Sequence, residues 1–84
     1  MSLAVEWTAG AMADLRAIAW QDAAWIAAEV ARYAEHGIGD MRRVPFPSGG
    51  DGLVLFLPGY RVWLTFDRMA RTLWFWRVAR AVSS

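Results

Sequence analysis

Residues 60–78 read YRVWLTFDRMARTLWFWRV, and this stretch decides the fold. Its first part, Tyr60 to Phe66, alternates between two sets of side chains, which is typical of a β-strand whose two faces meet different surroundings. Arg71 to Val78 is a second strand, and Asp67 to Ala70 is short enough to join the two as a hairpin. The stretch therefore predicts two neighbouring antiparallel strands near the end of the chain.

The alternation also assigns the two faces of these strands. In the first strand Val62, Leu64 and Phe66 share one face, which we expect to meet the core. The opposite face carries Arg61, Trp63 and Thr65. In residues 71–78 both alternating sets are apolar, so this strand is central or covered on both sides. The sequence leaves open which of its two sets meets the helices.

Helical periodicity precedes the strands. Thr8 offers a hydroxyl N-cap, and apolar residues at helical spacing after it predict a helix over residues 9–19. Asp22 is the expected N-cap of a second helix that runs to about His36, where Gly37 is well placed to end it. The short break between the two helices implies an antiparallel helical hairpin.

The remaining segments complete the order of elements. Residues 3–7 and 40–46 predict two short strands, 48–52 a Gly-rich turn, and 53–57 a short apolar strand. The resulting order is β-α-α-β-β-β-β. We therefore expect a single α+β domain over residues 1–84, in which an N-terminal strand precedes a helical hairpin packed on one face of a twisted antiparallel sheet.

The composition limits the classes of protein and site that the chain can form. Apolar residues make up 57% of its 84 residues, and six of them are Trp, which exceeds what one small core can cover. We therefore expect some Trp side chains at the surface or under a partner. The absence of cysteine excludes disulfides and cysteine-ligated zinc, and it favours the reducing cytoplasm.

Two further classes are not indicated. The sequence contains no recognisable motif for a nucleotide, a metal or another cofactor, so we expect no cofactor. The longest unbroken apolar run, residues 53–58, is too short to cross a bilayer, so we expect no membrane-spanning segment.

The net charge of +1 conceals an asymmetry. Residues 1–40 contain six acids and two Arg, whereas residues 41–84 contain seven Arg and two acids. There is no Lys, and Arg is the better match for phosphate and the better stacker on bases. A GC-rich genome would also explain the missing Lys, but it would not explain the asymmetry, which suggests an anionic partner for one surface.

One ordered set of short segments runs through nearly the whole chain. The segments are Val5-Glu6-Trp7-Thr8, Ala13-Asp14-Leu15, Glu35 to Arg43, Gly59-Tyr60-Arg61-Val62 through Asp67, Ala70-Arg71-Thr72-Leu73 and Arg77-Val78-Ala79-Arg80. Each segment alone is common. Together and in this order they resemble the RelE/ParE superfamily of toxins.

The resemblance implies two N-terminal helices on a twisted antiparallel sheet, which the periodicity predicts independently. It also implies the toxin of a type II toxin–antitoxin system, held inactive in a hetero-oligomer with its cognate antitoxin. RelE-like members cut mRNA on the ribosome, whereas ParE-like members inhibit DNA gyrase. A toxin homologue that only binds its antitoxin and an unrelated binding module are further alternatives.

The resemblance implies a catalytic set for RNA cleavage without a metal. Such cleavage needs a base for the 2′-hydroxyl, a cation for the phosphate and an acid for the leaving oxygen. Arg61 matches the Arg that contacts the scissile phosphate in RelE-like enzymes, although a surface ion pair would equally explain it. Arg80 lies in the basic C-terminal stretch, and Tyr60 is the family-placed residue able to move protons.

Other residues are candidates for contacts with RNA or with a partner. The candidates for RNA binding are Arg42, Arg43 and Arg77. Charge protection of an edge strand, or a structural contact within the sheet, would also explain these Arg residues. The candidates for partner binding are Trp63, Trp74 and Trp76. Such rings can instead stack on bases or belong to the core.

Two segments depart from the family pattern. Residues 53–57 read LVLFL, with nothing ionisable where RelE-like nucleases often carry Lys, and the tail ends AVSS over residues 81–84. His36 is the only histidine, and its position at the end of a helix is better explained by the helix dipole. These departures leave enzymatic activity open.

Overall fold

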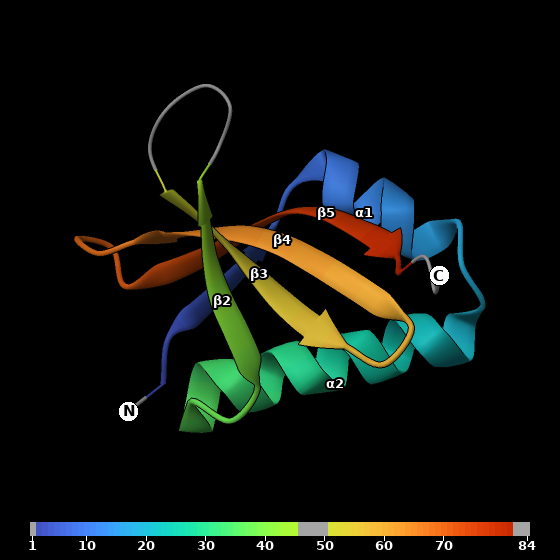
Figure 1. Cartoon of the computed structure of the whole chain (residues 1–84), viewed down its shortest axis with the longest axis horizontal. Coiled ribbons are helices and arrows are strands. Elements are labelled where there is room, and N and C mark those ends of the chain that lie inside the picture. Colours follow the sequence, from blue (N-terminus) through green and yellow to red (C-terminus); the bar gives the residue numbers. More distant parts are fainter. Residues whose placement is uncertain (1, 46–50, 82–84) are drawn as a thin grey trace.

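The computed structural model describes residues 2–45 and 51–81 (Figure 1). Its elements, in chain order, are β1 (Ala4–Trp7), α1 (Ala9–Arg16), α2 (Trp20–His36), β2 (Asp40–Pro45), β3 (Asp51–Leu57), β4 (Tyr60–Asp67) and β5 (Thr72–Arg80). The predicted order of elements is thereby confirmed. Residues 48–50 of the predicted turn and 82–84 of the tail lie outside the described residues.

The five strands form one sheet in the order β1-β5-β4-β3-β2. Strands β2 to β5 pair antiparallel with their neighbours, as predicted, but β1 pairs with β5 in parallel. The α+β class is confirmed, and the sheet is mixed rather than wholly antiparallel. A parallel pair needs a long connection, which the two helices and three intervening strands provide.

The helices begin and end through local capping. Thr8 caps α1 as predicted, because its Oγ1 accepts the Ala11 N–H at 3.3 Å, but α1 ends at Arg16 and not at residue 19. The prediction of Asp22 as the cap of α2 is wrong. That helix begins at Trp20, and Asp22 lies within its first turn. Gly37 ends α2 with φ +69°, a conformation that glycine adopts without strain.

Both helices contribute to one cluster of buried side chains. In α2 the stripe Ile26, Val30 and Ala34 repeats every four residues and is buried against the sheet. Helix α1 lies mainly against β5 and meets α2 less extensively (Figure 1). The sheet residues of the cluster are Leu55, Leu57, Tyr60, Val62, Leu64, Leu73, Phe75 and Val78.

A β-bulge in β5 answers the question that the sequence left open. Trp63 lies opposite Arg77 and Leu64 lies opposite Phe75, so Trp76 has no partner in the ladder. The alternation shifts by one residue at this point. Consequently Phe75 before the bulge and Val78 after it are both buried, whereas Trp76 is exposed.

Helix α1 continues the edge of β5 where β1 ends. The Thr8 N–H and hydroxyl both donate to the Phe75 carbonyl, at 3.0 and 2.9 Å. Farther along, the Val78 N–H donates to Asp14 Oδ2 at 2.8 Å. These bonds satisfy backbone groups of β5 on both sides of the bulge, and they fix the segment that carries Trp76 and Arg77.

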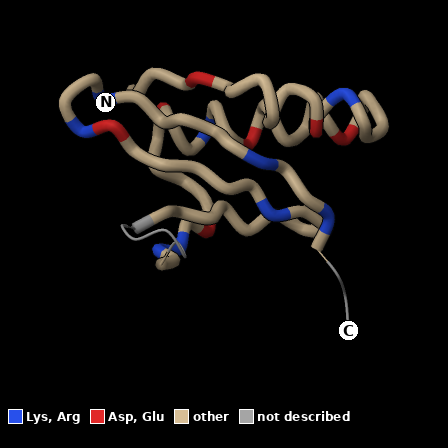
Figure 2. The backbone as a smooth tube through the Cα atoms, turned by 90° about the horizontal axis from the view of Figure 1, so that it is seen from above, with Lys and Arg blue, Asp and Glu red and all other residues tan. Residues whose placement is uncertain are grey.

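The charge asymmetry of the sequence becomes an asymmetry between layers. Figure 2 shows Asp and Glu positions mainly along the helical layer and Arg positions mainly along the strands and their connections. The acids of the helices are Asp14, Asp22, Glu29 and Glu35. The sheet therefore presents the basic side of the protein.

Candidate nucleic-acid interface

The sheet has an open face that points away from the two helices. Cross-strand partners share a face, so the residues opposite the buried set can be followed across β2, β3, β4 and β5. They include Asp40, Arg42, Val54, Phe56, Arg61, Trp63, Thr65, Trp74, Trp76, Arg77 and Ala79, of which Val54 is itself buried. We call this surface the open face.

Phe56 is the centre of a charged cluster on the open face. The guanidinium carbons of Arg42 and Arg61 lie 4.0 and 4.1 Å from the centroid of its ring. Arg42 also donates from Nε and Nη2 to the two carboxylate oxygens of Asp40, at 3.1 and 3.0 Å. These hydrogen bonds, helped by the charge of Arg61, hold the pKa of Asp40 below its ordinary value.

Arg61 is oriented by the turn that precedes it. Its Nη1 donates to the carbonyls of Leu57 and Tyr60, at 3.0 and 2.8 Å. The guanidinium is thus held against the start of β4, and it is only partly exposed. An Arg fixed in this way loses little conformational freedom when an anion binds to its remaining N–H groups.

Aromatic side chains occupy the other half of the open face. The Trp76 indole N–H donates to Thr65 Oγ1 at 2.8 Å, so the bulged residue lies across β4. The Arg77 guanidinium lies 5.7 Å from the Trp63 ring centroid. Trp74 and Trp76 remain 37% and 51% exposed, so two of the three predicted partner-facing Trp side chains are available for contacts.

Tyr60 and Arg80, which the family resemblance groups with Arg61, lie toward the other face of the sheet. Tyr60 is buried, and its hydroxyl donates to Asp22 Oδ2 at 2.7 Å. Arg80 is its cross-strand partner, with the guanidinium 5.5 Å from the Tyr60 ring. The Asp22 carboxylate, followed by burial, raises the pKa of Tyr60. Tyr60 and Arg80 thus lie on the opposite face of the sheet from the Arg61 guanidinium. The structure does not bring the three predicted catalytic residues together, and the catalytic role of Tyr60 and Arg80 stays a prediction.

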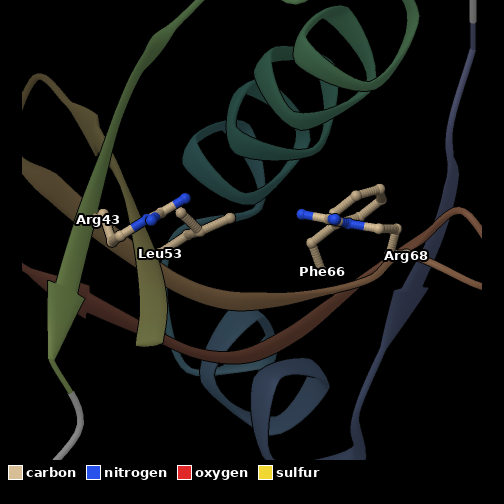
Figure 3. Close-up of a pocket in the computed structure, with 4 residues that line it drawn as sticks. All are labelled: Arg43, Leu53, Phe66 and Arg68. Atoms are coloured by element: carbon tan, nitrogen blue, oxygen red, sulfur yellow. The ribbon is translucent and has the colours of Figure 1, made fainter. Parts of the chain in front are cut away.

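Arg43 also faces the helical side of the sheet, unlike Arg42 beside it. With Leu53, Phe66 and Arg68 it lines a cavity of about 290 Å³ (Figure 3). Phe66 lies here because it follows the buried positions of β4, and it is 42% exposed instead of belonging to the core. The three predicted RNA-binding Arg residues are therefore divided between the two faces.

The sequence reasoning missed Phe56 and Asp40. Leu53, Leu55 and Leu57 share the inward face, so the same alternation would have placed Phe56 outward, beside Arg61 on the next strand. The two-residue spacing from Asp40 to Arg42 on one strand also indicates side chains on one face. These signals give the face of each side chain, but that Phe56 lies beside both Arg42 and Arg61 depends on the pairing of strands, which the sequence does not state.

The chain was compared with known protein families, curated proteins and solved structures. No family model and no curated relative matches the chain. Among solved structures, a chain of the toxin–antitoxin complex RelBE2 from Mycobacterium tuberculosis aligns with a TM-score of 0.81 and 18% identity, over 96% of this chain and 100% of that one. The chain has the RelE-like fold.

A second structure supports the same fold. A chain of the intact E. coli RelBE toxin–antitoxin complex aligns with a TM-score of 0.62 and 12% identity, over 98% of this chain and 100% of that one. The resemblance to the RelE/ParE superfamily is thereby confirmed at the level of the RelE-like fold. Among the described residues of this fold, neither helix combines the length and apolar character needed to span a membrane.

Proposed function

We propose that this chain is the toxin of a type II toxin–antitoxin system and forms a hetero-oligomer with its antitoxin. The RelE-like fold supports the proposal, since the two structures compared above are toxin–antitoxin complexes. Exposed apolar side chains support it as well, because Trp20, Trp76 and Met69 are 75%, 51% and 96% exposed. An antitoxin segment that folds on binding would remove such side chains from water.

The target in this proposal is mRNA on the ribosome. The carrying observation is the open face, where Arg42, Arg61 and Arg77 lie among aromatic rings. Arg neutralises backbone phosphates, and exposed rings stack on unpaired bases in a sequence-tolerant way. Proteins that recognise RNA sequences mainly bind single-stranded RNA, in which backbone phosphates and unpaired bases are both accessible. A single mRNA strand therefore suits this surface.

If the chain cleaves RNA, Arg61 is the residue proposed to stabilise the negative charge of the transition state. Its remaining N–H groups would hold the pentacovalent phosphate, and fixing them beforehand makes such stabilisation effective. Arg80 is proposed to add positive charge, and Tyr60 is proposed to relay the proton that the 2′-hydroxyl loses to the leaving 5′-oxygen. Because both residues lie toward the other face, either side chain would have to reach the phosphate around the edge of the sheet where β4 begins and β5 ends.

A second candidate function is binding without cleavage, as a ParE-like inhibitor of gyrase or as a homologue that only binds its antitoxin. One observation favours it: among the described residues, the open face contains no His or Tyr, and the chain contains no Lys. The low pKa of Asp40 keeps that carboxyl from acting as an acid near neutral pH. A surface of this kind binds anions more readily than it transfers protons.

Growth and RNA mapping separate these candidates. The chain is expressed in a bacterial host alone, with its neighbouring antitoxin gene, and as Arg61→Ala, while Arg32→Ala on α2 serves as a control of equal charge. The proposal predicts slowed growth that the antitoxin reverses, and primer extension then shows new 5′ ends in translated mRNA. Slowed growth with intact mRNA and altered DNA supercoiling supports the gyrase candidate. Normal growth with soluble, folded chain contradicts an active toxin.

A further inference from the structure

Asp40 occupies an anion site of the protein itself. Its two carboxylate oxygens accept hydrogen bonds from Nε and Nη2 of Arg42, at 3.1 and 3.0 Å. This two-pronged geometry is the one in which Arg also binds phosphate. The carboxylate therefore takes up the donors that Arg42 would offer to a nucleic-acid backbone.

A second cation lies beside this site. Arg61 lies over the same Phe56 ring as Arg42, with distances of 4.1 and 4.0 Å to the ring centroid. The charge of Arg61 contributes to the lowered pKa of Asp40, so the carboxylate lies in the field of both guanidinium groups. Strand β3, which carries Phe56, lies between β2 and β4, so the two guanidinium groups approach the ring from the two neighbouring strands. Asp40 occupies the donors of Arg42, and Arg61 lies beside the same ring.

The carboxylate is held in a way that permits exchange. The side chains of Arg42 and Asp40 are 57% and 53% exposed, and ion pairs between exposed groups are held weakly because water and salt screen them. Phosphate carries oxygens that match the same fork, and a neighbouring phosphate of the same strand can meet Arg61. Neighbouring Trp rings favour a nucleic-acid strand as the source of this phosphate over an acidic peptide, because they can stack on its bases.

We infer that Asp40 is a built-in competitor for RNA, whose carboxylate occupies the donors of Arg42, beside Phe56 and Arg61, until a backbone phosphate replaces it. The inference rests on the proposed binding of RNA and adds to it a residue that limits affinity. Asp40 thereby discriminates against weakly binding anions, since an anion must bind Arg42 more tightly than this carboxylate does in order to replace it.

The variant Asp40→Asn tests the inference, because it keeps the size of the side chain and removes its charge. Affinity for a short single-stranded RNA should rise roughly two- to fivefold, the range that an exposed ion pair represents. The salt dependence should also steepen by about 0.7 in the slope of log K against log salt, because the phosphate that binds Arg42 releases a condensed cation from the RNA without Asp40 taking one up. Glu35→Gln at the end of α2 changes the net charge equally and is the matched control.

Fluorescence anisotropy with labelled RNA gives both quantities, and nuclear magnetic resonance of the Arg42 Nε–H follows titration with inorganic phosphate. Tighter binding and a steeper slope in Asp40→Asn, but not in Glu35→Gln, support the inference. Equal RNA binding by the two variants overturns it and leaves the proposed function standing. If no protein binds RNA but phosphate shifts the Arg42 resonance in Asp40→Asn alone, the anion competition stands and the RNA target fails. Stronger binding of an acidic peptide with unchanged RNA affinity overturns the assignment to RNA.

Discussion

The hydrogen bond between Asp14 and Val78 offers a sharp test of how the open face is supported. Asp14→Ala removes the carboxylate that accepts the Val78 N–H at 2.8 Å, a partly buried contact across 64 positions in the sequence. A backbone donor left without a partner costs about 1–3 kcal/mol. Because a domain of this size has a free energy of unfolding of only about 5–15 kcal/mol, the loss is a substantial part of the total.

Asp14→Ala should lower the melting temperature of the whole domain and the protection of the amides near Val78. A loss of about 2 kcal/mol lowers the Tm of a domain of this length by roughly 8–16 °C, which calorimetry measures directly. Hydrogen exchange should show faster exchange of the Val78 amide, while the amides of α2 keep their relative protection. RNA binding should weaken as well, since the same contact fixes the segment that carries Trp76 and Arg77.

Asp14→Asn is the matched control, because its amide oxygen still accepts the Val78 N–H. It should lose less stability than Asp14→Ala and should retain slow exchange at Val78. Unchanged Tm and unchanged Val78 exchange in Asp14→Ala would refute the reasoning, and they would show that the edge of β5 is held by other contacts.

Three further predictions follow from the site and the surface. Asp22 raises the pKa of Tyr60, so its stabilising effect is complete below the ordinary tyrosine pKa of about 10 and is lost as the pH rises above it. Urea unfolding between pH 8 and 11 should therefore show a steeper alkaline decline for the wild type than for Tyr60→Phe, and equal declines would contradict the contact. Trp76→Ala should weaken binding of single-stranded RNA by about 1–3 kcal/mol, the value of one stacked base, whereas Trp20→Ala on α2 should leave it unchanged. The free chain should self-associate in sedimentation experiments and become soluble with its antitoxin, and a stable monomer at high concentration would argue against the partner-covered surface.

The period of two in residues 60–66 carried most of the fold prediction. It placed Val62 and Leu64 in the core and Arg61 and Trp63 on the opposite face, as the structure has them. It left the faces of residues 71–78 open because both alternating sets are apolar. The bulge at Trp76 shifts the alternation there, and a bulge is defined only relative to the partner strand.

Tertiary contacts explain the remaining differences. Asp22 has the local chemistry of an N-cap, but its carboxylate instead accepts the hydroxyl of a residue 38 positions away. Tyr60 lies two residues before Val62, so the alternation places its side chain on the buried face. The family resemblance instead suggested a catalytic role for it. The parallel pairing of β1 with β5 has no signal in the four residues of β1.

Translation in a reconstituted bacterial system tests the central claim most directly. The purified chain is added to ribosomes that translate a single mRNA, with Arg61→Ala and Arg32→Ala in parallel. The account predicts that the wild type and Arg32→Ala stop protein synthesis, and that Arg61→Ala lowers the rate of mRNA cleavage by about two orders of magnitude or more, since it removes a preorganised cation from the open face. Undiminished synthesis at saturating wild-type chain, or equal inhibition by folded Arg61→Ala, would contradict it.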